Sequence, residues 1–367
     1  MEFPRSLGGR GGLVLALLLA LLLRAGYGVE RSAQPDYRQP VVDAGYHDYW
    51  ARSLAGLPAE VPTGELDPAI GEHPCLRPPL YPWFLAGIYG VTGGSYAAPR
   101  VVQHGLGLLA VALVWCFARR ALGGGPALLA ALLFGLHWAP VYFEGELHAP
   151  ALVIPLLLGM ALCVQGLLAG AARPGWLAGA AGLLGGLAAT ARQGALLPLA
   201  AIGLLLGWRW WRGRRQEQPS GARLPGIALA SLAAGCALGI APATLRNVAA
   251  SGEPVLITSA GGINLYLGNR PGATAFLDSD LSELGLGRFR TCFDYAAIVR
   301  GLGEAGKPAP THSEVDAIFR SKAMDAIAAD PGGFLGRTWT KALLFLGPAE
   351  VGHNKDCLLY TSPSPRD

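Results

Sequence analysis

Long apolar runs separated by short charged segments dominate the chain. A helix needs about 20 mostly apolar residues to cross the hydrocarbon core of a membrane. The stretches between successive charged residues approach that length, and they are residues 101–118, 121–143, 147–172, 174–191, 193–208 and 224–245. This pattern predicts six membrane-spanning helices near 101–118, 122–143, 149–170, 174–191, 193–208 and 224–245.

Two further apolar segments lie near the ends of the chain. Gly11 to Leu23 is rich in leucine and is followed by Arg24, whose long stem can reach toward the membrane interface. We interpret it as a span near 11–28, and a cleaved signal peptide is the alternative. An eighth apolar segment near 333–349 is interrupted by Arg337 and Lys341.

Shorter patterns lie between these runs. Tyr81 to Val91 is too short to span and predicts an interfacial or re-entrant helix. Pro254 to Thr258 is β-like, and the segment from Ala260 to Gly268 is rich in glycine. An amphipathic helix is expected at about 312–329, where Pro331 and Gly332 end it. We therefore expect an all-α polytopic membrane protein with seven to eight transmembrane helices and extracytoplasmic loop helices.

Composition supports the bilayer as the solvent. The chain has 367 residues, of which 52% are hydrophobic and only 15% are charged, whereas soluble domains have about 25% charged residues. The net charge of +4 is small, and no basic stripe interleaved with aromatic residues is present, which excludes a nucleic-acid partner.

Basic residues orient the predicted bundle, because Lys and Arg in short loops remain cytoplasmic. They gather before the first span, after the second and fourth spans, and between the sixth and seventh: Arg5, Arg10, Arg119, Arg120, Arg173, Arg209, Arg212, Arg214, Arg215 and Arg223. We expect a cytoplasmic N-terminus, with 29–100, 144–148 and 246–331 on the opposite side.

The last eleven residues differ from the rest of the chain. Residues 357–367 read CLLYTSPSPRD, which matches a translated sequencing adapter of the transposase type. We exclude this segment from the fold, assign 1–356 to one transmembrane domain, and expect the native chain to continue beyond residue 356.

Few polar groups in the expected extracytoplasmic regions can carry chemistry. Asp43 opens a helix-like run and is either a helix cap or a functional carboxylate. Glu144, Glu146 and His148 are either a solvated turn or a functional cluster. Arg192, between two apolar spans, is either a snorkelling interfacial residue or an anion contact.

These groups are the ones that a transferase using a lipid-phosphate sugar requires. A carboxylate base activates the acceptor hydroxyl, and cations stabilise the departing phosphate. Neither a P-loop nor a dinucleotide-binding fingerprint follows a strand in this sequence, and lipid-linked donors need neither.

The order of motifs resembles the GT-C superfamily of polytopic glycosyltransferases. It is most similar to bacterial glycosyltransferase family 39 or RgtA/B/C/D-like proteins, which are related to protein O-mannosyltransferases and the aminoarabinose transferase. The matching elements are Asp43 to Arg52, Pro78 to Pro82 before Ile88 to Gly90, Arg100 with Gln103, Phe143 with Glu144, and Thr258 to Asn269.

The resemblance implies roles for particular residues. Asp43 looks like the catalytic first-loop acid, and Glu144 or Glu146, beside His148, like the second-loop acidic position. Arg192 looks like part of the lipid-phosphate site, although Gln193 follows it where relatives commonly have proline.

The other candidates for donor binding are Arg100, Asn264 and Asn269. The segment from Gly261 to Asn269 would be a loop that faces donor or acceptor, or else a Gly-rich turn. Some relatives bind a divalent cation near the first-loop acid, which makes Asp43 a possible metal ligand; no other cofactor is expected.

The expected activity is transfer of a sugar from a polyprenyl-phosphate donor to a hydroxyl of a lipid, glycan or protein acceptor. It would take place on the extracytoplasmic side of a bacterial inner membrane. The alternative is a polytopic transporter or flippase, which would favour ionisable residues near the middle of the spans. Here the charges lie at span ends and in loops.

Overall fold

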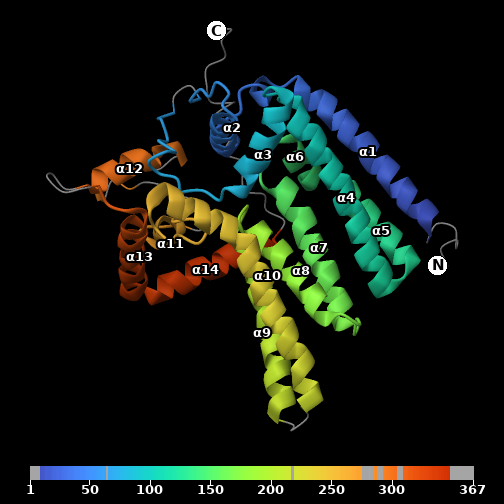
Figure 1. The fold of residues 1–367 in the computed structure, drawn as a ribbon. Coiled ribbons are helices and arrows are strands. Elements are labelled where there is room, and N and C mark those ends of the chain that lie inside the picture. Colours follow the sequence, from blue (N-terminus) through green and yellow to red (C-terminus); the bar gives the residue numbers. More distant parts are fainter. Residues whose placement is uncertain are drawn as a thin grey trace. The chain divides into compact units, whose positions relative to one another are not determined.

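The computed structural model describes residues 9–62, 65–215, 219–274, 281, 284–286, 292–303 and 309–347. The expected adapter-derived segment at 357–367 lies outside them. Every regular element in this described part is helical, which confirms the all-α expectation (Figure 1). The chain divides into two compact units, one made of 1–40, 47–60 and 78–246, the other of 41–46, 61–77 and 247–367.

The first unit contains the apolar helices. They are α1 (Arg10–Ser32), η1 (Pro35–Tyr37), α3 (Leu80–Thr92), α4 (Ala97–Leu122), α5 (Gly124–Gly135), α6 (Trp138–Gly145), α7 (Pro150–Leu168), α8 (Pro174–Ala189), η2 (Gln193–Ala195) and α9 (Leu196–Arg215). Two helices have residues in both units: α2 (Val42–Leu54) and α10 (Pro219–Ser251). The helix expected at 81–91 as an interfacial or re-entrant segment is present as α3.

Five described helices are long and apolar enough to cross a membrane. They are α1, α4, α7, α10 and the segment Gln193–Arg214, and a bent pair formed by α5 and α6 makes a sixth. The other two expected spans correspond to the helices α8 and α14 (Pro331–Leu346), and each of these has 16 residues.

The expected helix at 122–143 is broken by 47° between α5 and α6. His137 has an extended backbone, and its Nδ1 atom accepts a hydrogen bond from the amide of Ala139 at 3.2 Å. His137 therefore caps a new helix, and Pro140 in the first turn of α6 suits that start because its missing N–H would have no helical partner there. The bend sets the direction of α6, which carries Glu144 in its last turn.

Helix α4 packs against α1, α5, α6 and α7. Small side chains line its contacts with α1 and α5, and the buried cluster comprises Ala16, Ala20, Val111, Trp115, Ala118, Ala127, Leu128 and Ala131. Small residues let membrane helices approach closely, so that dispersion contacts hold them together.

Glycines allow the backbones of α8 and α10 to lie in direct contact. A Cβ atom on Gly182 would overlap the carbonyl oxygen of Leu232, and one on Gly235 would overlap that of Gly179. A Cβ atom on Gly239 would lie 2.7 Å from the carbonyl oxygen of Leu183. Both helices place glycines four residues apart along this contact, as close membrane pairs do.

The second unit contains α11 (Gly261–Asn269), η4 (Cys292–Asp294), α12 (Tyr295–Leu302), α13 (His312–Ala329) and α14. Helix α13 confirms the expected amphipathic helix, and a capping box between Thr311 and Glu314 fixes its start. The carboxylate of Glu253 also accepts hydrogen bonds from the amides of His312 at 2.9 Å and Ser313 at 2.8 Å.

Two local expectations in this unit were wrong. Residues 254–258 form no strand, because the side-chain amide of Asn247 donates to the carbonyls of Val255 and Ile257, each at 2.9 Å. The Gly-rich segment is the helix α11 rather than a loop or turn. Gly262 allows α11 to contact α13, where its amide donates to Asp316.

Candidate functional site

Asp43 lies in the first turn of α2, in the second unit. Its Oδ1 atom accepts a hydrogen bond from Nη2 of Arg77 at 2.8 Å. The two side chains remain 39% and 34% exposed, so the ion pair is accessible to a substrate. The guanidinium fixes the direction of the carboxylate, whose second oxygen can accept a proton.

The backbone before Asp43 is strained. Val42 has a φ of 55°, in the left-handed region where a β-branched side chain is a rare outlier. Such strain persists only where the surroundings impose it, and it gathers at functional sites. The geometry directs attention to Asp43 independently of any sequence motif.

Sequence reasoning missed Arg77. A signal was present, because Arg77 is the sole arginine or lysine between Arg52 and Arg100. Its partner Asp43 is 34 positions away in the chain, and local periodicity gives no information on such a pairing.

Asp48, five residues after Asp43 on α2, is a structural anchor in the first unit. It accepts hydrogen bonds from the Tyr89 hydroxyl at 2.6 Å and from Nε of Arg52 at 2.9 Å. Arg52 also donates to the Gly94 carbonyl at 3.0 Å and lies over the Tyr96 ring. Burial is the main cause that raises the pKa of Tyr96, and the Asp48 carboxylate raises it further. These contacts fasten α2 to the α3 region.

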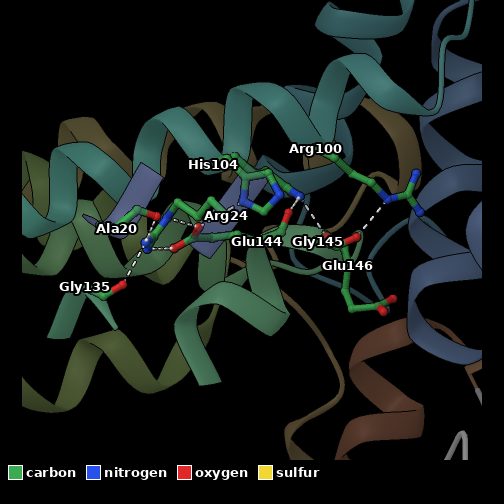
Figure 2. Close-up of polar contacts among 9 residues, drawn as sticks. Ala20, Arg24, Arg100, His104, Gly135, Glu144, Gly145 and Glu146 are labelled. Atoms are coloured by element: carbon green, nitrogen blue, oxygen red, sulfur yellow. Dashed lines mark hydrogen bonds and ion pairs between the residues drawn. The ribbon is translucent and has the colours of Figure 1, made fainter. Parts of the chain in front are cut away.

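Glu144 is buried in an ion pair with α1. Arg24 donates from Nε to Oε2 at 2.6 Å and from Nη2 to Oε1 at 2.7 Å, as Figure 2 shows. The Nη1 atom of Arg24 donates to the carbonyls of Ala20 and Gly135, and His104 lies 3.1 Å from Oε2 of Glu144. The expectation that Arg24 reaches toward the interface was wrong, since its side chain is 1% exposed.

Glu146 makes a second ion pair with α1. Nε of Arg31 lies 2.8 Å from Oε1 of Glu146, and Nη1 of the same arginine donates to Asp36 at 2.6 Å. Glu144 and Glu146 are both 3% exposed, so a solvated turn is excluded for this segment. His148 is half-buried beside the rings of His47 and Phe143.

Helix α4 holds the same segment from the other side. The Gln103 amide donates to the carbonyls of Glu144 and Glu146, each at 2.7 Å. Arg100 donates from Nε to the carbonyl of Gly145 at 2.8 Å, which Figure 2 also draws. The structure thus brings together Arg100, Glu144 and Glu146, three of the predicted site residues.

The other donor-binding candidates lie elsewhere. The Arg192 side chain is exposed in the first unit, directly before η2. Asn264 and Asn269 belong to α11 in the second unit: Asn264 is exposed, whereas the Asn269 amide is buried and donates to Leu265 of its own helix at 2.9 Å.

A divalent cation at Asp43 would find few protein ligands among the described residues. Oxygen-rich sites usually combine several carboxylates and carbonyls, and in the described part of the chain no three His, Cys, Asp or Glu side chains gather. The charged group bonded to Asp43 is the cation Arg77.

Residues 76–234 match the model of the dolichyl-phosphate-mannose-protein mannosyltransferase family. The match covers Arg77, Arg100, Glu144, Glu146, His148 and Arg192, whereas Asp43, Asn264 and Asn269 lie outside it. No curated protein and no solved structure matches the chain.

Proposed function

We propose that the chain is a membrane glycosyltransferase of the GT-C type, which moves a sugar from a polyprenyl-phosphate donor to an acceptor hydroxyl; the family match over residues 76–234 and the apolar helices support this. The acceptor is a lipid, a glycan or a protein. We place the reaction on the extracytoplasmic side of a bacterial inner membrane, because Arg119 and Arg120 at the end of α4 favour a cytoplasmic location for that end.

The observation that carries this proposal is the accessible pair of Asp43 and Arg77, 2.8 Å apart beside strained backbone. Asp43 accepts the proton of the acceptor hydroxyl while the hydroxyl oxygen attacks the anomeric carbon of the donor sugar. The bond between that carbon and the phosphate oxygen breaks, and polyprenyl phosphate leaves with the electron pair. Arg77 orients Asp43 through the hydrogen bond at 2.8 Å.

Cations and amides are needed for the departing phosphate. Arg192 is exposed and is available for such a contact, and a guanidinium matches phosphate oxygens in a bidentate fork. Arg100, Asn264 and Asn269 are the other candidates for donor binding. Glu144 and Glu146 position the segment around Gly145 through their ion pairs, rather than exchanging protons with substrate.

The test is sugar transfer by membranes that contain the chain. With a radiolabelled polyprenyl-phosphate sugar, Asp43→Asn is expected to lower transfer about 10²- to 10⁴-fold, the usual range for loss of a general base. Asp67→Asn is the matched control, because Asp67 is an exposed aspartate of the same unit and caps a turn at Ala69.

Equal transfer by Asp43→Asn and the wild-type chain, at equal expression, contradicts the base assignment. No transfer with a broad panel of donors, together with uptake of a lipid-linked substrate into vesicles, favours the transporter alternative.

A further inference from the structure

A polar groove of about 640 Å³ lies in the second unit, between α13 and the segment that joins α10 to α11. Helix α13 packs against α11 (Figure 1) and turns another face to the groove. The residues of that face recur about one turn apart: Ser313, Ala317, Arg320 and Met324. The facing segment contributes Thr258 and Ser259. A volume of this size accommodates a small ligand.

The two charged side chains in the groove neutralise each other. Arg320 donates from Nη2 to Oδ2 of Asp316, and Oδ1 of Asp316 accepts a hydrogen bond from the amide of Gly262. The Arg320 side chain is 63% exposed, and in the part of the chain that the structure describes it makes no other hydrogen bond, so its Nε and Nη1 atoms remain for a ligand. An anion would be repelled by Asp316 and a cation by Arg320. The pair therefore favours a neutral ligand.

Hydroxyl groups surround this ion pair. They belong to Thr258, Ser259, Ser313 and Ser321, which all line the groove, and a hydroxyl can both donate and accept. A carboxylate accepts hydrogen bonds at several positions and a guanidinium donates as a fork, so neighbouring hydroxyls of one ligand can bond to both. Val255 and Met324 supply an apolar part of the wall. A saccharide has the matching surface, because its rings carry hydroxyls at their edges and C–H groups on their faces.

The backbone of the facing segment argues against a peptide ligand. An extended peptide binds by adding a strand to an exposed sheet edge through main-chain hydrogen bonds. Residues 254–258 form no strand. The carbonyls of Val255 and Ile257 already accept hydrogen bonds from the Asn247 amide. The main-chain groups that a peptide would use are therefore engaged within the protein.

The groove is joined to the segment that carries Arg77. The amide of Ser259 donates to the carbonyl of Cys75 at 2.9 Å, and the Ser259 hydroxyl donates to the same carbonyl at 3.3 Å. Ser259 is 5% exposed, so this connection is buried. Cys75 lies two residues before Arg77, which binds Asp43. The wall of the groove is therefore held by the same segment that orients the proposed base.

We propose that this groove binds the acceptor, and that the acceptor is a neutral saccharide. Asp316 and Arg320 hold neighbouring hydroxyls of one sugar ring, and the serine and threonine hydroxyls hold others. The assignment of the bound saccharide as the acceptor rests on the proposed function. Saccharide binding itself requires neither the donor nor proton transfer by Asp43.

The experiment is saturation-transfer NMR on the purified full chain in detergent. The probes are mannotriose, maltotriose, a short peptide rich in serine and threonine, and inorganic phosphate. Ala317→Leu fills the groove and is expected to abolish the trisaccharide signal. Ala328→Leu is the matched control, because Ala328 is also exposed on α13 and does not line the groove. Arg320→Gln is expected to weaken trisaccharide binding about tenfold, the effect of losing a hydrogen bond to a charged group, and Lys322→Gln changes an exposed cation of α13 outside the groove.

Trisaccharide binding that Ala317→Leu and Arg320→Gln weaken, and that the two controls preserve, supports the site. Binding of the peptide without either trisaccharide overturns the assignment to a saccharide, and binding of inorganic phosphate alone overturns the choice of a neutral ligand. Equal trisaccharide binding by Ala317→Leu and Ala328→Leu overturns the location. A wild-type chain that binds none of the probes overturns the proposal as a whole.

Transfer assays separate this inference from the proposed function. With the trisaccharide as acceptor, Arg320→Gln is expected to raise the KM for the acceptor about tenfold at unchanged kcat, because the lost contact holds ground state and transition state alike. Asp43→Asn is expected to bind the trisaccharide as the wild-type chain does and to lose transfer. Trisaccharide binding without any transfer by the wild-type chain contradicts the proposed function, whereas transfer with an unchanged KM in Arg320→Gln contradicts the role of the groove.

Discussion

The Arg24 side chain neutralises a carboxylate that lies 120 positions away in the chain. All of the contacts between Arg24 and Glu144 are buried, with exposed fractions of 1% and 4% for the two side chains. The net value of such a pair relative to apolar residues is small, but loss of one partner leaves a buried charge without compensation. The pair is therefore informative in a double-mutant cycle.

Arg24→Gln is expected to lower the free energy of unfolding by about 3–5 kcal/mol. The double variant Arg24→Gln with Glu144→Gln should recover a large part of that loss, because no buried charge is then left over. Thermal unfolding in detergent, followed by tryptophan fluorescence, measures the stability of the single and the double variant. Arg38→Gln, which changes an exposed arginine just after η1, is the control. A double variant as unstable as Arg24→Gln contradicts a direct charge interaction.

At the scale of helices, the contact between α8 and α10 depends on glycines. Alanine normally stabilises a helix by up to about 1 kcal/mol relative to glycine. At Gly182 the opposite sign is expected, because the new methyl group would overlap the Leu232 carbonyl. Gly207 on α9 offers a comparison, since its Cβ atom would only touch Leu229 at 4.0 Å.

We expect Gly182→Ala to lower stability by about 1–3 kcal/mol, as overpacking does, whereas Gly207→Ala should be neutral or stabilising. Resistance to unfolding in mixed detergent micelles measures the difference. If both variants gain stability, α8 and α10 are not in close contact in the folded protein.

Most helices were predictable from the sequence, because a membrane segment must satisfy its backbone internally and so appears as an uncharged run. Both ends of α13 were predictable from local signals as well, since Thr311 with Glu314 marks its start and Pro331 follows its end. The helix α11 was not, because its glycines suggest a turn until α13 is placed against it.

The candidate site was predictable only in part. The sequence indicated which acids to consider, and it indicated Arg100 through the family resemblance. It gave no sign that Arg24 and Arg31 would enter the protein interior, or that Arg77 would bind Asp43, since those pairings depend on how distant segments fold together.

At the scale of the molecule, the second unit has a pH response of its own. His73 is buried near Tyr295 and His312, with ring centroids at 5.5 and 5.8 Å. Burial lowers the pKa of His73, as do the charges of His312 and Arg300, while Glu72 opposes them. The unfolded chain therefore binds a proton more readily, and stability falls as the pH drops below about 6.5.

Protonation of Glu253 causes a second loss of stability, at lower pH. Its burial acts to raise its pKa, but hydrogen bonds from Ser313 and His312 outweigh that effect and lower it. The stability that Glu253 contributes is complete above its ordinary pKa of 4.5. It is lost as the pH falls through the lower pKa that Glu253 has in the folded protein.

Hydrogen exchange, corrected for intrinsic rates, is expected to show less protection in α13 at pH 5.5 than at pH 7.5. In His73→Gln this difference in the protection of α13 should shrink. The protection of α8, the control, should be the same in His73→Gln and in the wild-type chain. Unchanged protection of α13 across this range would contradict a buried neutral His73.

The left-handed backbone of Val42 sets stability against the proposed activity at one position. A glycine would adopt its φ of 55° without steric cost, so selection for a sturdier fold would favour glycine there. The same replacement would free the backbone that directs Asp43 and would blur the aim of the proposed base. Val42→Gly is therefore expected to give a more stable chain with slower transfer, so that one backbone angle separates the two properties.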